Sequence, residues 1–248
     1  MTMSDLLRGA ALSYRALFTW LNPLGYLSSR IVRPIGIAVA FTATTSHYGA
    51  PLGPTLVGTS LLAGAHAVIY GMALAVGNER NFGTMPIWLA SPQNILGAVC
   101  QRALPHLADG FVSGFLTYLV CSALYRNLLL PIDVFAVLLL LALVSAFGTG
   151  LVVAGLNLRV RDTFLWPNIA VLAMILFSGV LLAPAQLPGL LRPAASAFPL
   201  SHLMSSVRAG PGLGHLADSV LAELVTGACW AAAGVLVVRF ALRRRPSD

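Results

Sequence analysis

The chain has 248 residues, of which 58% are hydrophobic and only 9% are charged, and its formal net charge is +7. A soluble domain carries about 25% charged residues, so this composition excludes a water-soluble fold of this size and predicts an all-α integral membrane protein with one transmembrane domain over residues 1–248. All fifteen basic residues are arginine, and the lack of lysine excludes a phosphate-loop ATPase, a Schiff-base enzyme and a serine–lysine hydrolase.

The first expected element is a helix over residues 4–20 that lies along the membrane surface. Its apolar side chains recur at helical spacing, while Arg8 and Arg15 fall on the other face, as in an interfacial amphipathic helix. The sequence Asn22-Pro23-Leu24-Gly25 then predicts a turn that leads the chain into the bilayer.

Six apolar runs follow, each long enough to cross a membrane, for which about 20 residues are needed. They cover approximately residues 28–46, 55–77, 98–123, 132–156, 163–183 and 216–240. Arg30 and Arg33 occupy the opening turns of the first run, where their side chains are expected to reach the headgroups. The fourth run carries a stripe of small residues that predicts close helix packing: Ala142, Ala146, Gly150 and Ala154.

The arginines predict the orientation of these runs. An even number of spans places both termini on one side, and that side holds Arg8, Arg15, Arg30, Arg33, Arg80, Arg102, Arg159, Arg161, Arg239, Arg243, Arg244 and Arg245. The other side holds Arg126, Arg192 and Arg208. Because positive residues concentrate on the cytoplasmic side, both termini are expected in the cytoplasm, and the net charge requires no nucleic-acid partner.

Two connections between the runs are distinctive. Residues 78–92 join the second and third runs on the expected cytoplasmic side, and a short helix there is expected to end at Ser91-Pro92. Residues 183–214, between the fifth and sixth runs, contain five prolines yet remain apolar. Short re-entrant helices in the outer leaflet, covered by protein, are expected in this outside segment.

This layout resembles the permease subunits of type-2 ABC transporters. The most specific similarity is Glu79-Arg80-x-x-Gly83-Thr84 followed by Leu89-Ala90-Ser91-Pro92, which is similar to the family's cytoplasmic segment between the second and third spans. Residues 157–162 and 198–203 are similar to the family's loop before the fifth span and its segment before the last span. Met85-Pro86 departs from the family, which usually has a small polar or acidic residue after Gly-Thr.

The resemblance implies the membrane-spanning half of a multidrug or natural-product efflux system in a bacterial cell membrane. It implies three partners: an ABC ATP-binding subunit that carries ATP and Mg²⁺, a second permease subunit, identical or different, and membrane lipid. The chain itself would bind no cofactor or metal and would not be an enzyme. The residues that would couple it to the ATPase are Glu79, Arg80, Phe82, Gly83, Thr84 and Trp88. Export of a lipid-linked glycan is an alternative within the same family.

Ionisable side chains inside the apolar runs are candidates for the transport pathway or a gate. Asp109 lies about two turns into the third run, where it is expected to pair with His106 or with Arg102. Such a pair would either fix the end of the helix or contact a proton or the substrate.

Two further ionisable residues lie in other runs. Glu223 is expected near the outside, with Arg208 as its partner, in either a structural role or the outer gate. His66, in the second run, is expected to be a neutral imidazole hydrogen-bonded to a neighbouring helix.

Two other functional classes remain as alternatives. An intramembrane enzyme needs convergent catalytic groups at one depth, but the chain has no Gly-x-Ser-x-Gly, no His-Glu-x-x-His and no clustered acidic pair. A secondary transporter usually has internal repeats or broken helices in matching positions, for which only Pro105 and the polar start of the first run give any indication.

Overall fold

The computed structural model describes residues 8–12, 14–15, 22–91, 94–126, 128–160, 162–210 and 213–243. This part of the chain is all-α and contains no strand. Its elements are α2 (Pro23–Leu27), the π-helix η1 (Ser28–Val32), α3 (Arg33–His47), α4 (Leu52–Asn81), α5 (Met85–Ala90), α6 (Ile95–Tyr125), α7 (Ile132–Asn157), α8 (Leu165–Phe177), the 3₁₀ turn η2 (Pro184–Gln186), α9 (Arg192–Ala195), α10 (Ser201–Ala209) and α11 (Leu213–Arg243).

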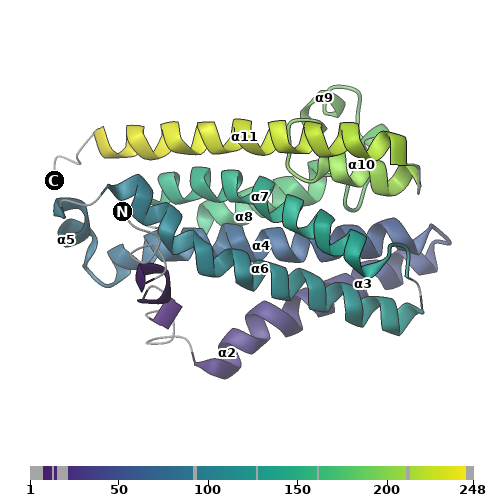
Figure 1. Ribbon diagram of the computed structural model, residues 1–248, viewed down its shortest axis with the longest axis horizontal. Helices are drawn as coiled ribbons and strands as arrows, with labels where there is room; N and C mark the ends of the chain where they lie inside the picture. The colour runs from purple at the N-terminus through teal and green to yellow at the C-terminus, as the bar shows by residue number, and fades with distance from the viewer. Residues whose placement is uncertain are drawn as a thin grey trace.

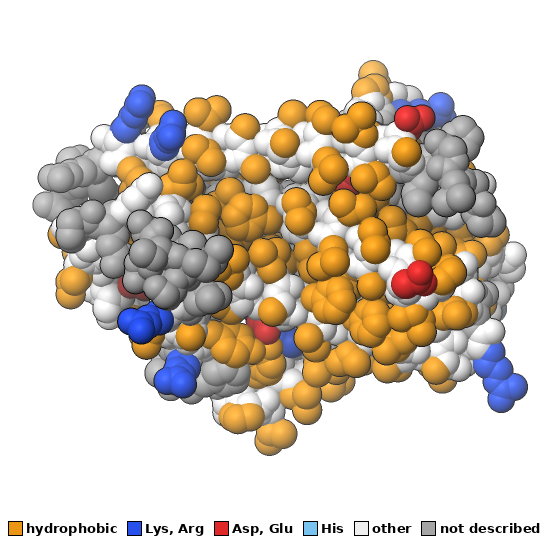
Figure 2. Space-filling model, in the orientation of Figure 1, with side chains coloured by type: hydrophobic (Ala, Val, Ile, Leu, Met, Phe, Trp, Pro, Cys, Tyr) orange, Lys and Arg blue, Asp and Glu red, His pale blue; other side chains and the backbone are white. Residues whose placement is uncertain are grey.

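Five helices in the described residues are long and apolar enough to cross a membrane, which confirms the expected multi-pass fold. They are the continuous helix Pro23–His47, then α4, α6, α7 and the stretch Ala217–Arg243 of α11. They run side by side along the long axis of the molecule (Figure 1). Hydrophobic side chains cover the middle of the face in Figure 2, and most of the Arg side chains visible on it lie toward one end, as expected for a protein embedded in a bilayer.

The fifth expected run differs from the prediction because its helix is short. α8 has 13 residues, about 20 Å at 1.5 Å per residue, which is less than the hydrocarbon thickness. The chain leaves helical geometry after Phe177 and bends at Gly179, whose φ is +76°. Arg208 of α10 donates to the carbonyl oxygens of Gly179 at 2.7 Å and Val180 at 3.3 Å. The guanidinium thereby satisfies backbone groups that would otherwise be costly in an apolar surrounding.

The first crossing helix begins earlier than expected and contains a π-helical segment. The Asn22 side chain accepts a hydrogen bond from the Gly25 N–H group at 2.6 Å and Pro23 occupies the first turn, so the expected turn is a helix N-cap. One wider turn, Ser28–Val32, separates α2 from α3. Such π-bulges are frequent at functional sites.

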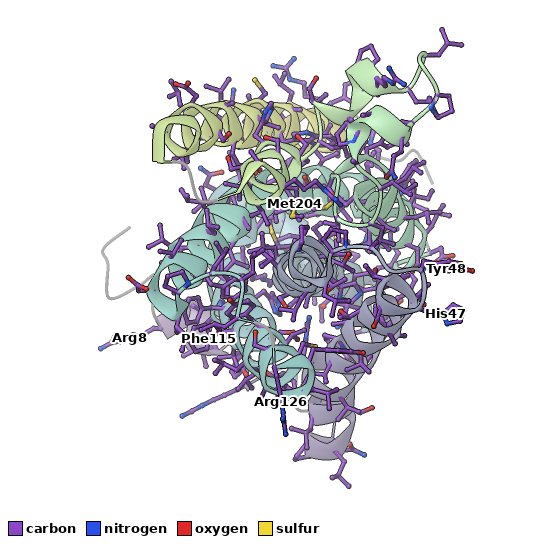
Figure 3. All side chains as sticks on the ribbon, turned by 90° about the vertical axis from the view of Figure 1, so that its right-hand side faces the viewer. Arg8, His47, Tyr48, Phe115, Arg126 and Met204 are labelled. Atoms are coloured by element: carbon purple, nitrogen blue, oxygen red, sulfur yellow. The ribbon has the colours of Figure 1, made fainter. Side chains whose placement is uncertain are left out.

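α4 is the most buried of the crossing helices and lies near the middle of the bundle when it is viewed end-on (Figure 3). Glycines let other helices approach it closely. A Cβ atom at Gly64 would lie 3.0 Å from the carbonyl oxygen of Gly110 in α6, and one at Gly150 in α7 would lie 2.4 Å from the Met72 sulfur. The small-residue stripe of α7 is therefore a packing surface, as expected.

α7 also packs closely on α11. A Cβ atom at Gly148 would lie 2.6 Å from the backbone nitrogen of Ala231 and 2.7 Å from the carbonyl oxygen of Gly227. The two backbones meet without an intervening side chain, so only glycine fits at this crossing.

The short helices occupy the two ends of the bundle. α5 lies at the same end as the last turn of α11, and α9 and α10 lie at the other end (Figure 1); these are called the α5 end and the α10 end below. Short helices were expected in residues 183–214, and η2, α9 and α10 confirm them. α10 inserts the buried side chain of Met204 between the long helices, where its Cε would lie 3.0 Å from a Cβ at Gly58 of α4.

The expected interfacial helix over residues 4–20 falls only partly within the described residues. Residues 8–12 and 14–15 are helical. Ala10 is buried and Leu12 is 67% exposed. The rest of that segment, like Pro92 and residues 211–212 of the two connections, lies outside the described residues.

Candidate functional site

A tight turn between α4 and the next long helix carries the short helix α5. Gly83 has a φ of +69°, a conformation that glycine adopts without steric cost. The Thr84 N–H group donates to the Glu79 carbonyl oxygen at 2.8 Å and closes the turn. Pro86 then lies in the first turn of α5, where the missing N–H group costs nothing. The Met85-Pro86 sequence is therefore compatible with a helix start.

Internal contacts hold α5 against the long helices. Arg102 of α6 forms a salt bridge with Glu79 and lies over the Trp88 ring, with its Cζ 4.6 Å from the ring centroid. Arg80 donates hydrogen bonds to the carbonyl oxygens of Val160 and Leu158 after α7. These contacts bind Glu79, Arg80 and Trp88 to the rest of the molecule, with Trp88 buried and Glu79 and Arg80 half-buried.

The side chains that α5 and its turn present outward are apolar. Ile87 is 74% exposed, Phe82 57% and Leu89 40%, whereas Trp88 is only 7% exposed. We call Phe82, Ile87 and Leu89 the α5 surface. Of the residues expected to meet a partner, Phe82 belongs to this surface, Gly83 forms the turn beside it, and Thr84 bonds back to Glu79.

A second group of polar side chains surrounds Asp109 of α6. Its Oδ1 accepts hydrogen bonds from the hydroxyl groups of Tyr14, at 3.1 Å, and Tyr26. His106 Nδ1 lies 3.5 Å from Oδ2, so the expected His106 pairing is confirmed, while Arg102 bonds elsewhere. Burial raises the pKa of the Tyr14 hydroxyl, which keeps it protonated as a donor.

Arg30 lies in the π-helix and completes this group. Its side chain is 7% exposed, and Nη1 donates to the Ala67 carbonyl oxygen at 3.0 Å. Ala67 is at the middle of α4, about 22 Å from either end of that helix. The expectation that Arg30 reaches the headgroups is therefore wrong. It is held inside the bundle, close enough to Asp109 for the two charges to interact.

Arg33 follows one turn later and lies beside a cavity of about 350 Å³ between α3, α4 and α8. The side chain is exposed and has no hydrogen bond or ion pair with any described residue. An arginine near a helix centre in a bilayer costs about 2.5 to 3.5 kcal/mol on insertion scales. An unpaired one beside a cavity is therefore a candidate binding group.

Besides Thr59, whose hydroxyl donates within its own helix, the other polar residues of the cavity are His66, Tyr70 and Asn168. The His66 ring stacks on Tyr70, with centroids 4.3 Å apart, and has no hydrogen bond to another described residue, contrary to expectation. The Tyr70 hydroxyl donates to the Asn168 side-chain oxygen. Apolar and small residues make up the rest of the wall: Pro34, Ile37, Thr59, Leu62, Ala63, Val171, Leu172 and Ile175.

Glu223 of α11 is fully buried but does not pair with Arg208. Its Oε1 accepts a hydrogen bond of 2.7 Å from the backbone N–H of Leu200. Leu200 is the N-cap residue of α10 and has a φ of +71°. A carboxylate at a helix N-terminus is stabilised by the unpaired N–H groups there, so Glu223 attaches α10 to α11. Arg208 bonds to Gly179 and Val180 instead.

Comparison with known proteins gives no functional assignment, so the functional residues are identified from this geometry. No known family model and no curated protein matches the chain. The described residues contain no group of three His, Cys, Asp or Glu side chains that could hold a metal ion. The chain is a multi-pass membrane protein with an exposed apolar α5 surface, a buried polar group around Asp109 and a cavity beside Arg33.

Sequence reasoning missed four of the polar residues at these sites, Tyr14, Tyr26, Tyr70 and Asn168. Tyr14 and Tyr26 carried no signal, because tyrosine is common at membrane interfaces. Asn168 was detectable as a polar residue within the fifth apolar run, but its proximity to Tyr70, 98 residues earlier, depends on the packing of α8 against α4.

Proposed function

We propose that this protein is the membrane-spanning permease subunit of an ATP-driven exporter that moves an amphipathic small molecule out of the cytoplasm. ATP would be hydrolysed by a separate subunit bound at the α5 end, which would be cytoplasmic, and two permease subunits would pair. The proposal joins the resemblance of residues 78–92 to type-2 ABC permeases with the geometry of that segment.

The observation that carries the proposal is the α5 surface. α5 is six residues long, too short to cross a membrane, and lies at the end of the bundle where α11 terminates. Its exposed Ile87 and Leu89, with Phe82 in the turn before it, form an apolar patch outside the crossing helices, and such patches mark protein contacts. The salt bridge between Glu79 and Arg102 fixes its position relative to α4 and α6, so a force applied at α5 would reach the crossing helices.

The test is co-purification of the full chain in detergent with ATP-binding subunits from the same genome, tried one by one, with each protein expressed alone as the control. A stoichiometric complex that is lost in Ile87→Asp and Phe82→Asp supports the proposal. Leu190→Asp is the matched control, because Leu190 is 95% exposed near α9 at the other end. A chain that purifies folded and binds none of these subunits contradicts it.

The buried group around Asp109 favours a second candidate, a proton-coupled secondary transporter. Asp109, His106 and Arg30 are ionisable residues near the centres of crossing helices, and such residues mark proton relays. The π-helical break in the first crossing helix fits this class as well. Transport into sealed vesicles driven by a proton gradient, with no ATP-binding subunit present, would favour this candidate over the exporter.

A further inference from the structure

The cavity beside Arg33 has its polar and apolar residues at opposite ends. On α3, Arg33 precedes Ile37; on α4, Tyr70 and His66 lie nearer the α5 end than Leu62 and Thr59. On α8, which starts at the α5 end, Asn168 precedes Val171, Leu172 and Ile175. All three helices therefore place their larger polar groups toward the α5 end and aliphatic groups toward the α10 end. The Thr59 hydroxyl, toward the α10 end, donates to backbone carbonyl oxygens of its own helix.

The polar end has unused hydrogen-bond donors and no negative charge. Arg33 offers five N–H groups with no partner among the described residues. The oxygen of the Asn168 side chain accepts from Tyr70, so its amide N–H groups remain as donors. None of the lining residues is acidic. A ligand that fits must bring hydrogen-bond acceptors and negative charge to this end.

The apolar end is lined by aliphatic side chains from each of the three helices, Ile37, Leu62, Val171, Leu172 and Ile175. The volume of about 350 Å³ lies at the lower end of the range for small-molecule sites. A single hydrocarbon chain suits such a cavity better than a rigid polycyclic compound, because it can continue along the helices toward the α10 end.

We infer that this cavity binds a single-chain anionic amphiphile, with its carboxylate or phosphate on Arg33 and Asn168 and its hydrocarbon chain directed toward the α10 end. The inference rests on the proposed export function, because it names the class of molecule that is transported. The ligand is a single-chain molecule and not a phospholipid of the surrounding bilayer.

The test is photolabelling of the full chain in lipid nanodiscs, without any ATP-binding subunit. The probe is dodecanoate that carries a diazirine near the end of its chain and an alkyne for detection; the corresponding alcohol is the uncharged control. We expect saturable labelling by the carboxylate, at least tenfold more efficient than by the alcohol, with adducts in α3, α4 and α8 near Ile37, Leu62 and Ile175.

Matched variants test the role of Arg33 in binding the carboxylate. Arg33→Gln should lower the apparent affinity for the carboxylate about tenfold, the loss expected for one charge-assisted hydrogen bond, and Arg33→Lys should recover much of it. Arg239→Gln, which removes an exposed arginine of α11 outside the cavity, should change nothing. A second cavity, lined by Val225, Thr226 and Trp230 among others and by no charged residue, should show no preference for the carboxylate.

Three results would overturn the inference. Equal labelling by acid and alcohol would show that the charge is not recognised, and unchanged labelling of Arg33→Gln would show that Arg33 is not the binding group. Loss of labelling when phosphatidylglycerol replaces phosphatidylcholine in the nanodiscs would assign the cavity to a bilayer lipid. Because no ATP-binding subunit is present, these results are independent of whether the α5 surface binds one.

Discussion

Asp109 and Arg30 show how single residues connect three elements of this membrane protein. Asp109 accepts hydrogen bonds from Tyr14, before the first crossing helix, and from Tyr26 in α2. Arg30 donates to Ala67 in α4. Both charges are buried, so each depends on the other and on these hydrogen bonds for compensation.

The charge of Asp109 can be tested separately from its hydrogen bonds. Asp109→Asn keeps an acceptor for the tyrosines but leaves Arg30 without its neighbouring negative charge. We expect a loss of about 3 kcal/mol in stability, since removing one member of a buried charge pair leaves the other uncompensated. The measurement is the thermal denaturation midpoint of the detergent-solubilised protein.

A double variant provides the decisive comparison. Asp109→Asn combined with Arg30→Gln should be more stable than the sum of the single losses predicts, because the remaining unpaired charge is gone. Asp133→Asn, at an exposed aspartate in the first turn of α7, should change the midpoint little. Strictly additive losses would mean that Asp109 and Arg30 are not coupled.

At the scale of elements, the positions of the long helices could be predicted and their irregularities could not. Runs of apolar residues located α4, α6, α7 and α11 within a few residues, because crossing a bilayer requires a long apolar helix. The early end of α8 depends on the bend at Gly179 and on hydrogen bonds from Arg208. A contact across 29 residues leaves no periodic trace in the sequence.

The candidate site, too, could be predicted from the sequence only in part. The segment around Glu79 was identified from local sequence, and the short helix that ends before Ser91 is present. Which of its residues face outward was not predictable, because the burial of Trp88 depends on Arg102 in the following helix. The cavity beside Arg33 was missed because its walls come from three helices.

Substitutions at two glycines test the close crossing of α7 and α11, one at the crossing and one in α3 as the control. Gly148→Ala would place a Cβ atom 2.6 Å from a backbone nitrogen of α11, so the two helices must separate. We expect a loss of about 1 to 3 kcal/mol from overpacking. Gly36→Ala is the matched control, since no atom lies within 4 Å of its added Cβ atom, and alanine in a helix should be neutral or stabilising by up to about 1 kcal/mol.

The thermal denaturation midpoint of the detergent-solubilised protein distinguishes the two glycine variants. A lower midpoint for Gly148→Ala, with an unchanged or raised midpoint for Gly36→Ala, is the expected pattern. Equal midpoints for both variants would show that the α7–α11 crossing is loose enough to admit a methyl group.

At the scale of the whole molecule, the two ends of the bundle differ in charge. Arg80, Arg102, Arg159, Arg239 and Arg243 lie toward the α5 end, and Arg126, Arg192 and Arg208 lie toward the α10 end. Arg30 lies within the bundle and Arg33 lies beside the cavity, so neither counts toward either side. The bias remains after this correction, and it predicts a cytoplasmic α5 end.

Cysteine labelling of intact cells tests this orientation. In a chain whose native Cys100, Cys121 and Cys229 are replaced by alanine, Leu190→Cys should react with a membrane-impermeant maleimide, because Leu190 is 95% exposed near α9. Phe82→Cys, in the α5 surface, should react only after the membrane is permeabilised. Labelling of Phe82→Cys in intact cells would reverse the orientation, and an α5 surface outside the cell could not bind an ATP-hydrolysing subunit. The exporter function would then be excluded by topology alone, whereas the cavity beside Arg33 would keep its ligand with the anionic end directed outward.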